Sequence, residues 1–435
     1  MHVGRRRVGA WLLAVVVGVG APAAAYAQAT PILIEPLPTP DYDRDRNVSV
    51  SQRPKPEYDA LGIRLGSFVA SPSTAVSMAF SDNVYTNNDN KHSDIYLIFQ
   101  PYLNVSSDWN VHRMSLTAAG DIRRYASQTL KDQNTWYVYT DGRLDIGRDI
   151  RIELDAQIDR AVESPYSEDI AANLTVPSSY LRTLAAVKGV HTGGQSRITG
   201  TLDRSTYTFS DIRFADGVRR TQDYRDRTIN RGSLAFEKAA SPSASFYVQA
   251  TYDITDYSSP TFFGQPNRDS KGYVLALGSS FDLAGLARGT VAVGYTYRDY
   301  DANLYADPEG LSVQARAEWF ATELTTVNLA AQRRLLDVSL GNSGAYWDTR
   351  IRAGADHELL YNLVVSGGIE AIDRNYTEYN ARTRVYQADL GARYQANRWL
   401  GLEAQIGFGS SRSAGDRLTN PFDELRSFIR VQVRR

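Results

Sequence analysis

The sequence predicts an all-β fold, a single transmembrane antiparallel β-barrel of about 18 strands. Three observations support this fold class. Apolar and polar residues alternate along most of the chain, long connections alternate with short ones, and no long apolar run follows the N-terminal segment. A membrane-spanning helix needs about 20 consecutive apolar residues, whereas a barrel strand crosses with about ten alternating ones.

The alternation is clearest between Arg151 and Asp159. The odd positions carry charged or amide side chains and the even positions carry apolar ones. Because successive side chains of a strand point to opposite faces, one face is apolar and the other polar. A strand of a soluble sandwich would show the same pattern, with its polar face in water. Its recurrence along nearly the whole chain favours a membrane barrel, with lipid on the apolar side and a water-filled lumen on the polar side.

The N-terminus has the three parts of a secretory signal peptide. Arg5, Arg6 and Arg7 precede a short apolar run, and Ala25-Tyr26-Ala27 supplies the small residues of a cleavage site. A membrane anchor would need a longer apolar run. We therefore predict a signal peptide over residues 1–27 and export of the chain to the periplasm, the outside or the outer membrane. Together with the barrel pattern, this favours the outer membrane of a Gram-negative cell.

Residues 28–60 are rich in proline and charge, so we predict a disordered periplasmic linker there. This segment is too short to make a folded plug domain. The barrel is expected over residues 61–435. The chain has no cysteine, which excludes a lipid-anchored lipoprotein and a disulfide framework. The formal net charge of −1 favours neither nucleic acid nor another polyanion as a partner.

The predicted strands are even in number, as expected of a bacterial single-chain barrel. They cover residues 61–83, 94–107, 113–125, 135–146, 151–159, 176–190, 197–207, 224–238, 244–257, 271–281, 289–300, 310–320, 325–334, 347–356, 362–374, 383–395, 400–409 and 426–434.

The connections alternate in length, which a soluble repeat protein would have no reason to do. The long ones cover residues 84–93, 164–175, 210–223, 258–270, 301–308, 336–346, 375–382 and 410–423, and the short ones 147–149, 192–195, 241–243, 284–286, 321–324 and 396–399. Outer-membrane barrels have long outside loops and short periplasmic turns, so both ends of the barrel chain are expected in the periplasm.

Aromatic residues gather at the predicted strand ends, which favours two aromatic girdles at the membrane interfaces over ordinary strand aromatics. Those expected near the long loops are Tyr125, Tyr207, Tyr257, Tyr295, Tyr297 and Tyr300. Those expected near the short turns are Trp109, Phe236, Phe246, Phe281, Trp319, Phe320 and Trp399.

Four short segments resemble a known family. They are Gly62-Ile63-Arg64-Leu65-Gly66-Ser67-Phe68, Asp82-Asn83-Val84-Tyr85, Gly142-Arg143-Leu144-Asp145-Ile146 and Asn420-Pro421-Phe422-Asp423. In this order they resemble the outer-membrane β-barrel porin family associated with bacterial exopolysaccharide export, over about residues 53–435. The resemblance implies an outer-membrane barrel and, for some members, a part in moving polysaccharide to the cell surface with periplasmic export proteins as partners. It implies no catalytic residues.

No catalytic, cofactor or metal site is expected. The five histidines stand alone, without the Ser-His-acid grouping or the ligand spacing that such sites need. Acidic residues of the long loops, such as Asp89 and Glu168, lack the regular spacing of a calcium site and are expected to be solvated.

The lumen is a better candidate for a functional site than the histidines or the loop acids, because charged and tyrosine side chains share the inward face of neighbouring strands. The candidates are Asp121, Arg123, Tyr137, Tyr139, Asp141, Arg143, Asp145, Arg151, Glu153, Asp155, Asp159, Arg225, Arg227, Arg231, Arg350, Arg352, Arg393, Glu403 and Arg430. Many of these charges are expected to pair across strands and to stabilise the wall. The functional alternative is a hydrated wall along which sugars or small solutes move.

Three functions fit this reading. The first is a non-enzymatic conduit for exopolysaccharide, with polysaccharide as substrate and outer-membrane lipid around it. The second is a general diffusion porin for small hydrophilic solutes. The third is a structural barrel that anchors an envelope assembly and conducts nothing.

Overall fold

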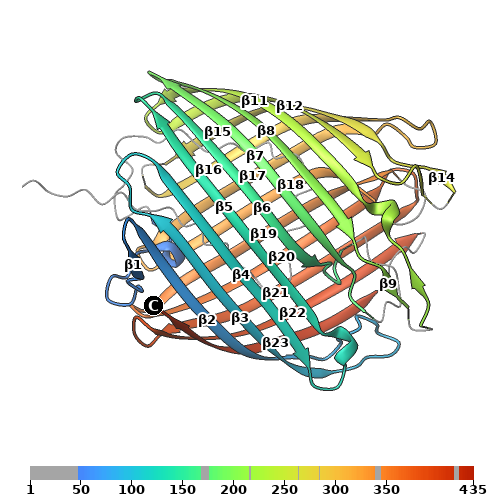
Figure 1. Cartoon of the computed structure of the whole chain (residues 1–435), viewed down its shortest axis with the longest axis horizontal. Helices are drawn as coiled ribbons and strands as arrows, with labels where there is room; N and C mark the ends of the chain where they lie inside the picture. Colours follow the sequence, from blue (N-terminus) through green and yellow to red (C-terminus); the bar gives the residue numbers. More distant parts are fainter. Residues whose placement is uncertain are drawn as a thin grey trace, which may run out of the picture.

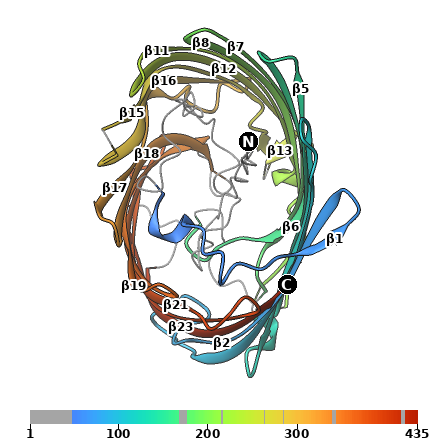
Figure 2. The same ribbon diagram turned by 90° about the vertical axis from the view of Figure 1, so that its left-hand side faces the viewer.

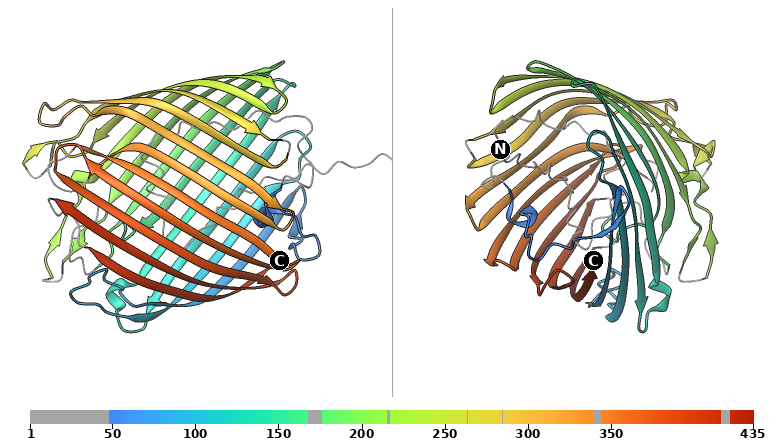
Figure 3. Two further views of the ribbon diagram at one scale, coloured as in Figure 1. Left: turned by 180° about the vertical axis from the view of Figure 1, so that it is seen from behind. Right: turned by 60° about the vertical axis from the view of Figure 1, so that its left-hand side comes forward.

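The structure, a computed structural model, describes residues 48–167, 176–214, 217–262, 264–283, 285–338, 344–415 and 421–435. Within these residues 18 long antiparallel strands form one closed barrel (Figures 1 and 3). The barrel closes because the first long strand pairs with the last, from Ser73 opposite Arg434 to Ser81 opposite Arg426. The prediction of an all-β barrel with 18 strands is confirmed.

Each long strand pairs with its sequence neighbours in simple up-and-down order. The strands are β2 (Phe68–Ser81), β3 (Asp94–Ser107), β4 (Arg113–Tyr125), β5 (Gln133–Ile146), β6 (Ile150–Val162), β7 (Ser179–Gly193), β8 (Ser196–Phe209), β11 (Arg227–Ser241), β12 (Ala244–Tyr257), β15 (Ser270–Asp282), β16 (Ala287–Tyr300), β17 (Glu309–Thr322), β18 (Thr325–Asp337), β19 (Ala345–Leu360), β20 (Leu363–Tyr376), β21 (Ala381–Gln395), β22 (Leu400–Gly415) and β23 (Phe422–Arg434).

The other described elements are short. They are the strands β1 (Ile63–Leu65), β9 (Ile212–Arg213), β10 (Arg219–Arg220), β13 (Thr261–Phe262) and β14 (Gln265–Pro266), and the 3-10 turns η2 (Val50–Gln52), η3 (Thr129–Lys131) and η4 (Asp223–Arg225). Among the described residues no helix is long and apolar enough to cross a membrane.

Several predicted strand boundaries were wrong, and two of them show why. The first predicted strand, 61–83, is divided by a hairpin between β1 and β2, where Gly66 has a φ of 63° that side chains with a Cβ rarely adopt. The predicted strand 224–238 begins later, because Tyr224 and Arg225 belong to η4. Elsewhere the backbone pairing continues beyond the residues that alternate. For example, β22 pairs with β21 as far as Gly415, which lies opposite Ala381.

The alternation of connection lengths is confirmed. Links such as 147–149, 194–195 and 242–243 lie at one end of the barrel, and links such as 82–93 and 258–269 lie at the other. We call these the short-turn end and the long-loop end. The C-terminus and β1 lie at the short-turn end (Figure 1), which faces the periplasm in outer-membrane barrels.

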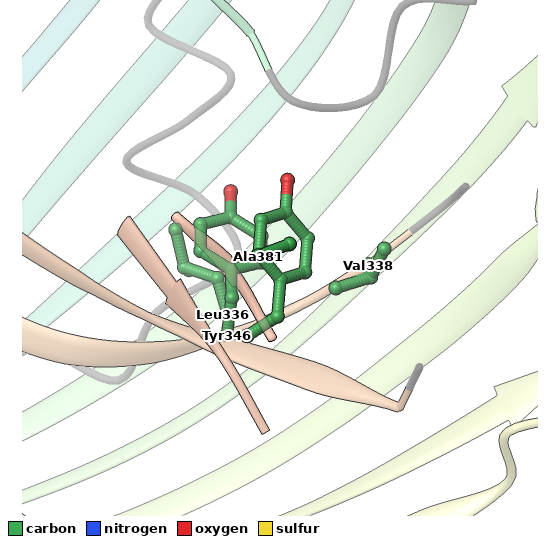
Figure 4. Packing of buried hydrophobic residues seen from close by; sticks show 5 residues of the cluster. Leu336, Val338, Tyr346 and Ala381 are labelled. Atoms are coloured by element: carbon green, nitrogen blue, oxygen red, sulfur yellow. The ribbon is translucent and has the colours of Figure 1, made fainter. Parts of the chain in front are cut away.

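The outer face of the wall is apolar. Large side chains on it keep much of their surface exposed, for example Leu277 at 67% and Ile369 at 63%. Soluble proteins rarely expose a continuous apolar surface of this extent, so the face is suited to lipid. Side chains of the opposite parity turn inward and pack on one another. Figure 4 shows one such cluster, in which Leu336, Val338 and Tyr346 are buried together at the long-loop end of β18–β21.

Each of the two predicted aromatic girdles is supported only in part. Near the short turns, Phe246 and Trp399 are exposed on the outside, although Phe320 is buried. Near the long loops Tyr295 is exposed, as predicted, but Tyr207, Tyr257 and Tyr300 are buried. Their odd numbers place Tyr207 and Tyr257 on the opposite face from apolar neighbours such as Leu202 and Tyr252, so they point inward.

The predicted signal peptide and the first part of the predicted linker lie outside the described residues. Residues 48–60 differ from the predicted disordered linker, because the structure gives them defined contacts. They cross the opening at the short-turn end, inside the ring of strands (Figure 2). Their own side chains and carbonyl groups, together with charged residues of the wall, make these contacts.

Candidate functional site: the barrel lumen

The inward wall of β4–β7 is a layer of paired charges. Residues two apart on one strand share a face, and three of the pairs form in this way: Arg123 with Asp121 at 2.8 Å, Arg143 with Asp145 at 2.8 Å, and Arg151 with Glu153 at 2.7 Å. Other contacts join neighbouring strands. They are Arg113–Asp141 (2.9 Å), Tyr139–Asp155 (2.5 Å), Lys188–Glu153 (3.0 Å) and Arg182–Asp159 (2.8 Å). Tyr137 lies opposite Asp159 in the β5–β6 ladder.

The arginines predicted near β11 have a more buried setting. Arg225 donates two hydrogen bonds to the carboxylate of Glu163 and lies 4.0 Å from the ring centre of Phe209. Arg227 lies over the ring of Tyr207 at 4.8 Å. Both arginines are at most 2% exposed, so they stabilise the wall and have little surface for a solute. Arg231 lies 3.9 Å from Asp203.

A second buried network joins β18, β19 and β20. The carboxylate of Asp348 lies 3.1 Å from Arg374, 3.6 Å from Arg350 and 4.0 Å from Arg334. Arg350 also contacts Glu370 at 3.4 Å. Arg350 was predicted from the sequence, whereas Asp348 and Arg374 were not, although their alternation with outward apolar residues places them on the inward face. Arg352, two residues from Arg350 on β19, is half-buried.

On β21–β23, Glu403 connects two of the predicted residues. Its carboxylate lies 3.1 Å from Arg430 and 3.9 Å from Arg393. The predicted residues are thus brought into several separate ion-pair networks around the wall, and no single cluster gathers them. Among the described residues no group of three or more His, Asp or Glu side chains could hold a metal ion.

Residues 163–167, here called the inward loop, cross the lumen after β6 (Figure 2). The Tyr166 hydroxyl donates to Glu424 of β23 at 3.0 Å. Its ring packs with Ile372 of β20, Val385 of β21 and Phe422 of β23. In the order of the wall, β5, β4, β3 and β2 separate β6 from β23, so these contacts reach a distant part of the wall.

Both ends of the inward loop are held. Arg225 binds Glu163 at its beginning, and the guanidinium of Arg374 donates to the carbonyl oxygen of Tyr166 at 2.8 Å. Arg374 also contacts Asp348, so the inward loop is connected to the buried network of β18–β20. The connection 164–175 was predicted from the sequence, but its direction was not, because the contacts that set it come from strands more than 200 residues away.

A closed wall that is apolar outside, charged inside and narrowed by a loop defines a membrane β-barrel of porin architecture. The family model described as "Putative beta-barrel porin 2" matches residues 55–435. The chain belongs to this family, and its place is the outer membrane. No curated protein sequence matches the chain.

Several solved porins are similar in structure. OpdK of Pseudomonas aeruginosa is 10% identical, with a TM-score of 0.44 over 84% of this chain and 99% of that one. OccK2 (OpdF) of the same organism is 11% identical, with a TM-score of 0.47 over 85% and 98%. A BenF-like porin from Pseudomonas fluorescens Pf-5 is 12% identical, with a TM-score of 0.45 over 85% and 100%.

Proposed function

We propose that this barrel is a non-enzymatic diffusion channel for small hydrophilic solutes in the outer membrane. The observation that carries the proposal is the inward face, where most charges have a partner of opposite sign on the same or a neighbouring strand. Such a wall is hydrophilic without a strong field of one sign, which suits a range of small polar solutes. Barrels of 16–18 strands enclose an aqueous channel.

The residues proposed to contact solutes are the predicted lumen residues that keep some exposed surface. They are Asp121, Arg123, Tyr137, Tyr139, Asp141, Arg143, Asp145, Arg151, Glu153, Asp155, Arg231, Arg352, Arg393, Glu403 and Arg430. Asp159, Arg225, Arg227 and Arg350 are buried, and we assign them to support of the wall and of the inward loop.

Exopolysaccharide export, the first expectation from the sequence, receives no support from the comparisons. A polymer would also have to pass the inward loop, which Tyr166 and Arg374 hold against the far wall. The diffusion channel therefore replaces export as the preferred function. A purely structural barrel remains the alternative if no solute passes.

The test is solute flux through the purified protein. Liposomes that contain the barrel should swell in small sugars and amino acids and progressively less in larger oligosaccharides, whereas protein-free liposomes should not swell. A deletion strain should lose uptake of a small solute and keep its surface polysaccharide. Reduced polysaccharide that the intact gene restores, together with unchanged solute uptake, would favour export instead.

A further inference from the structure

Residues 48–60, which we call the N-terminal strap, extend from β1 across the short-turn opening to the opposite wall (Figure 2). The far end of the strap is the turn η2. Val50 is 1% exposed there, and its backbone N–H donates to the Thr326 hydroxyl of β18 at 3.1 Å. A buried apolar side chain with a satisfied amide is a defined docking contact.

Charge also holds this end of the strap. Arg53 and Lys55 lie 3.5 Å and 3.3 Å from the same carboxylate oxygen of Glu358, on β19. Arg53 additionally donates to the carbonyl oxygen of Glu323, in the turn between β17 and β18, at 2.5 Å. Glu358 is 6% exposed, so water screens its attraction to the two cations less than on an open surface, and loss of either partner would leave a buried charge unpaired.

The middle of the strap is bound by residues from the other side of the opening. Arg398 donates to the carbonyl oxygens of Pro56 and Glu57 at 3.0 and 3.2 Å. Arg434 donates to the carbonyl oxygen of Tyr58 at 2.7 Å. The strap therefore contacts the wall at several widely separated points around one opening, and it passes over the lumen between them.

The barrel does not need the strap in order to close. The β2–β23 ladder completes the sheet, and no described strap residue pairs with a strand. Pro54 and Pro56 lack the N–H groups that such pairing would use. The contacts that hold the strap are ion pairs, hydrogen bonds that involve a side chain of the strap or of the wall, and one buried apolar residue. The strap can therefore detach while every strand stays paired.

We propose that the strap is a releasable gate at the short-turn mouth of the pore: when docked on Thr326 and Glu358 it restricts the passage, and when released it opens it. This inference rests on the proposed channel function. The segment that covers the mouth is the chain's own residues 48–60. Glu358 is the residue of the wall that holds this segment in place, and we call it the latch.

A disulfide can lock the gate, because the chain has no native cysteine. Val50→Cys with Thr326→Cys should form a cross-link in the folded barrel, whereas Val50→Cys with Val327→Cys should not, since Val327 lies on the other face of β18. In planar bilayers the oxidised Val50–Thr326 pair should stay at a low single-channel conductance. A reductant should restore openings to a higher level.

A latch variant tests the same gate without a cross-link. Glu358→Gln should increase the fraction of time that the channel spends at the higher conductance. Glu318→Gln is the matched control, because Glu318 loses the same charge near the same end of the lumen but pairs with Arg288 and not with the strap. This control should gate like the unmodified protein. Faster migration of the unheated than of the heated protein in SDS gel electrophoresis verifies that each variant barrel is folded.

The outcomes separate the two proposals. A folded barrel that forms no Val50–Thr326 cross-link, or that conducts equally when oxidised, reduced or carrying Glu358→Gln, would overturn the gate and leave the channel intact. Barrels that fold and cross-link but conduct in no variant would overturn the channel function, and the gate with it.

Discussion

Replacement of Tyr166 should release the inward loop and change the channel's conductance. The side chain is 5% exposed and packs against Ile372, Val385 and Phe422. Loss of an aromatic burial costs about 1.5–3 kcal/mol, and loss of a hydrogen bond to a charged acceptor costs a similar amount. Because both are lost, we expect Tyr166→Ala to weaken docking by at least about 3 kcal/mol, which is at least about 100-fold in the ratio of docked to released loop.

The assay is single-channel recording in planar bilayers. Tyr166→Ala should show a larger or more strongly fluctuating conductance, and larger oligosaccharides should enter its liposomes. Tyr166→Phe is the matched control, since it keeps the ring and loses only the hydroxyl bond to Glu424. Its effect on the same ratio should be about tenfold to 100-fold, and smaller than that of Tyr166→Ala. Equal conductance and equal size limits for the three proteins would refute the reasoning that this contact narrows the pore.

Three further predictions concern the wall and its ends. Leu154→Arg, on the exposed apolar face, should cost about 2–4 kcal/mol of folding free energy, the penalty for a lipid-facing arginine. Asp155→Arg should cost much less, because Asp155 lies opposite Asp141 in the β5–β6 ladder. Equal losses of folding free energy in the two variants would contradict the assigned faces. A single cysteine at Asn90 in a long loop should react with a membrane-impermeant reagent on intact cells, and one at Ser243 in a short turn should not. The reverse result would invert the orientation. Burial lowers the pKa of Lys131, in the η3 turn, to about 8. Acylation of Lys131, followed by peptide mass mapping, should therefore reach half of its maximal rate near pH 8. A midpoint above pH 10 would contradict this burial.

The alternation of apolar and polar residues along the chain determined most of the fold. Alternation with period two is a local property, so it could be read for each strand separately, and β3, β4 and β12 begin and end where the sequence predicted. The same alternation already predicts that Tyr207 and Tyr257 point inward, because they lie an odd number of residues from outward neighbours such as Leu202 and Tyr252. Position near a strand end does not change the face to which a side chain points, so the girdle prediction was wrong for these two residues.

Only the tertiary structure decided what fills the lumen. Tyr166 bonds to Glu424, 258 residues away, and Val50 bonds to Thr326, 276 residues away. No local pattern encodes such contacts, because they arise only when the closed barrel brings distant strands around one cavity. The sequence alone identified the charged inward residues of the wall, while closure of the barrel determined which of them pair, which are buried, and where the inward loop and the N-terminal strap cross the pore.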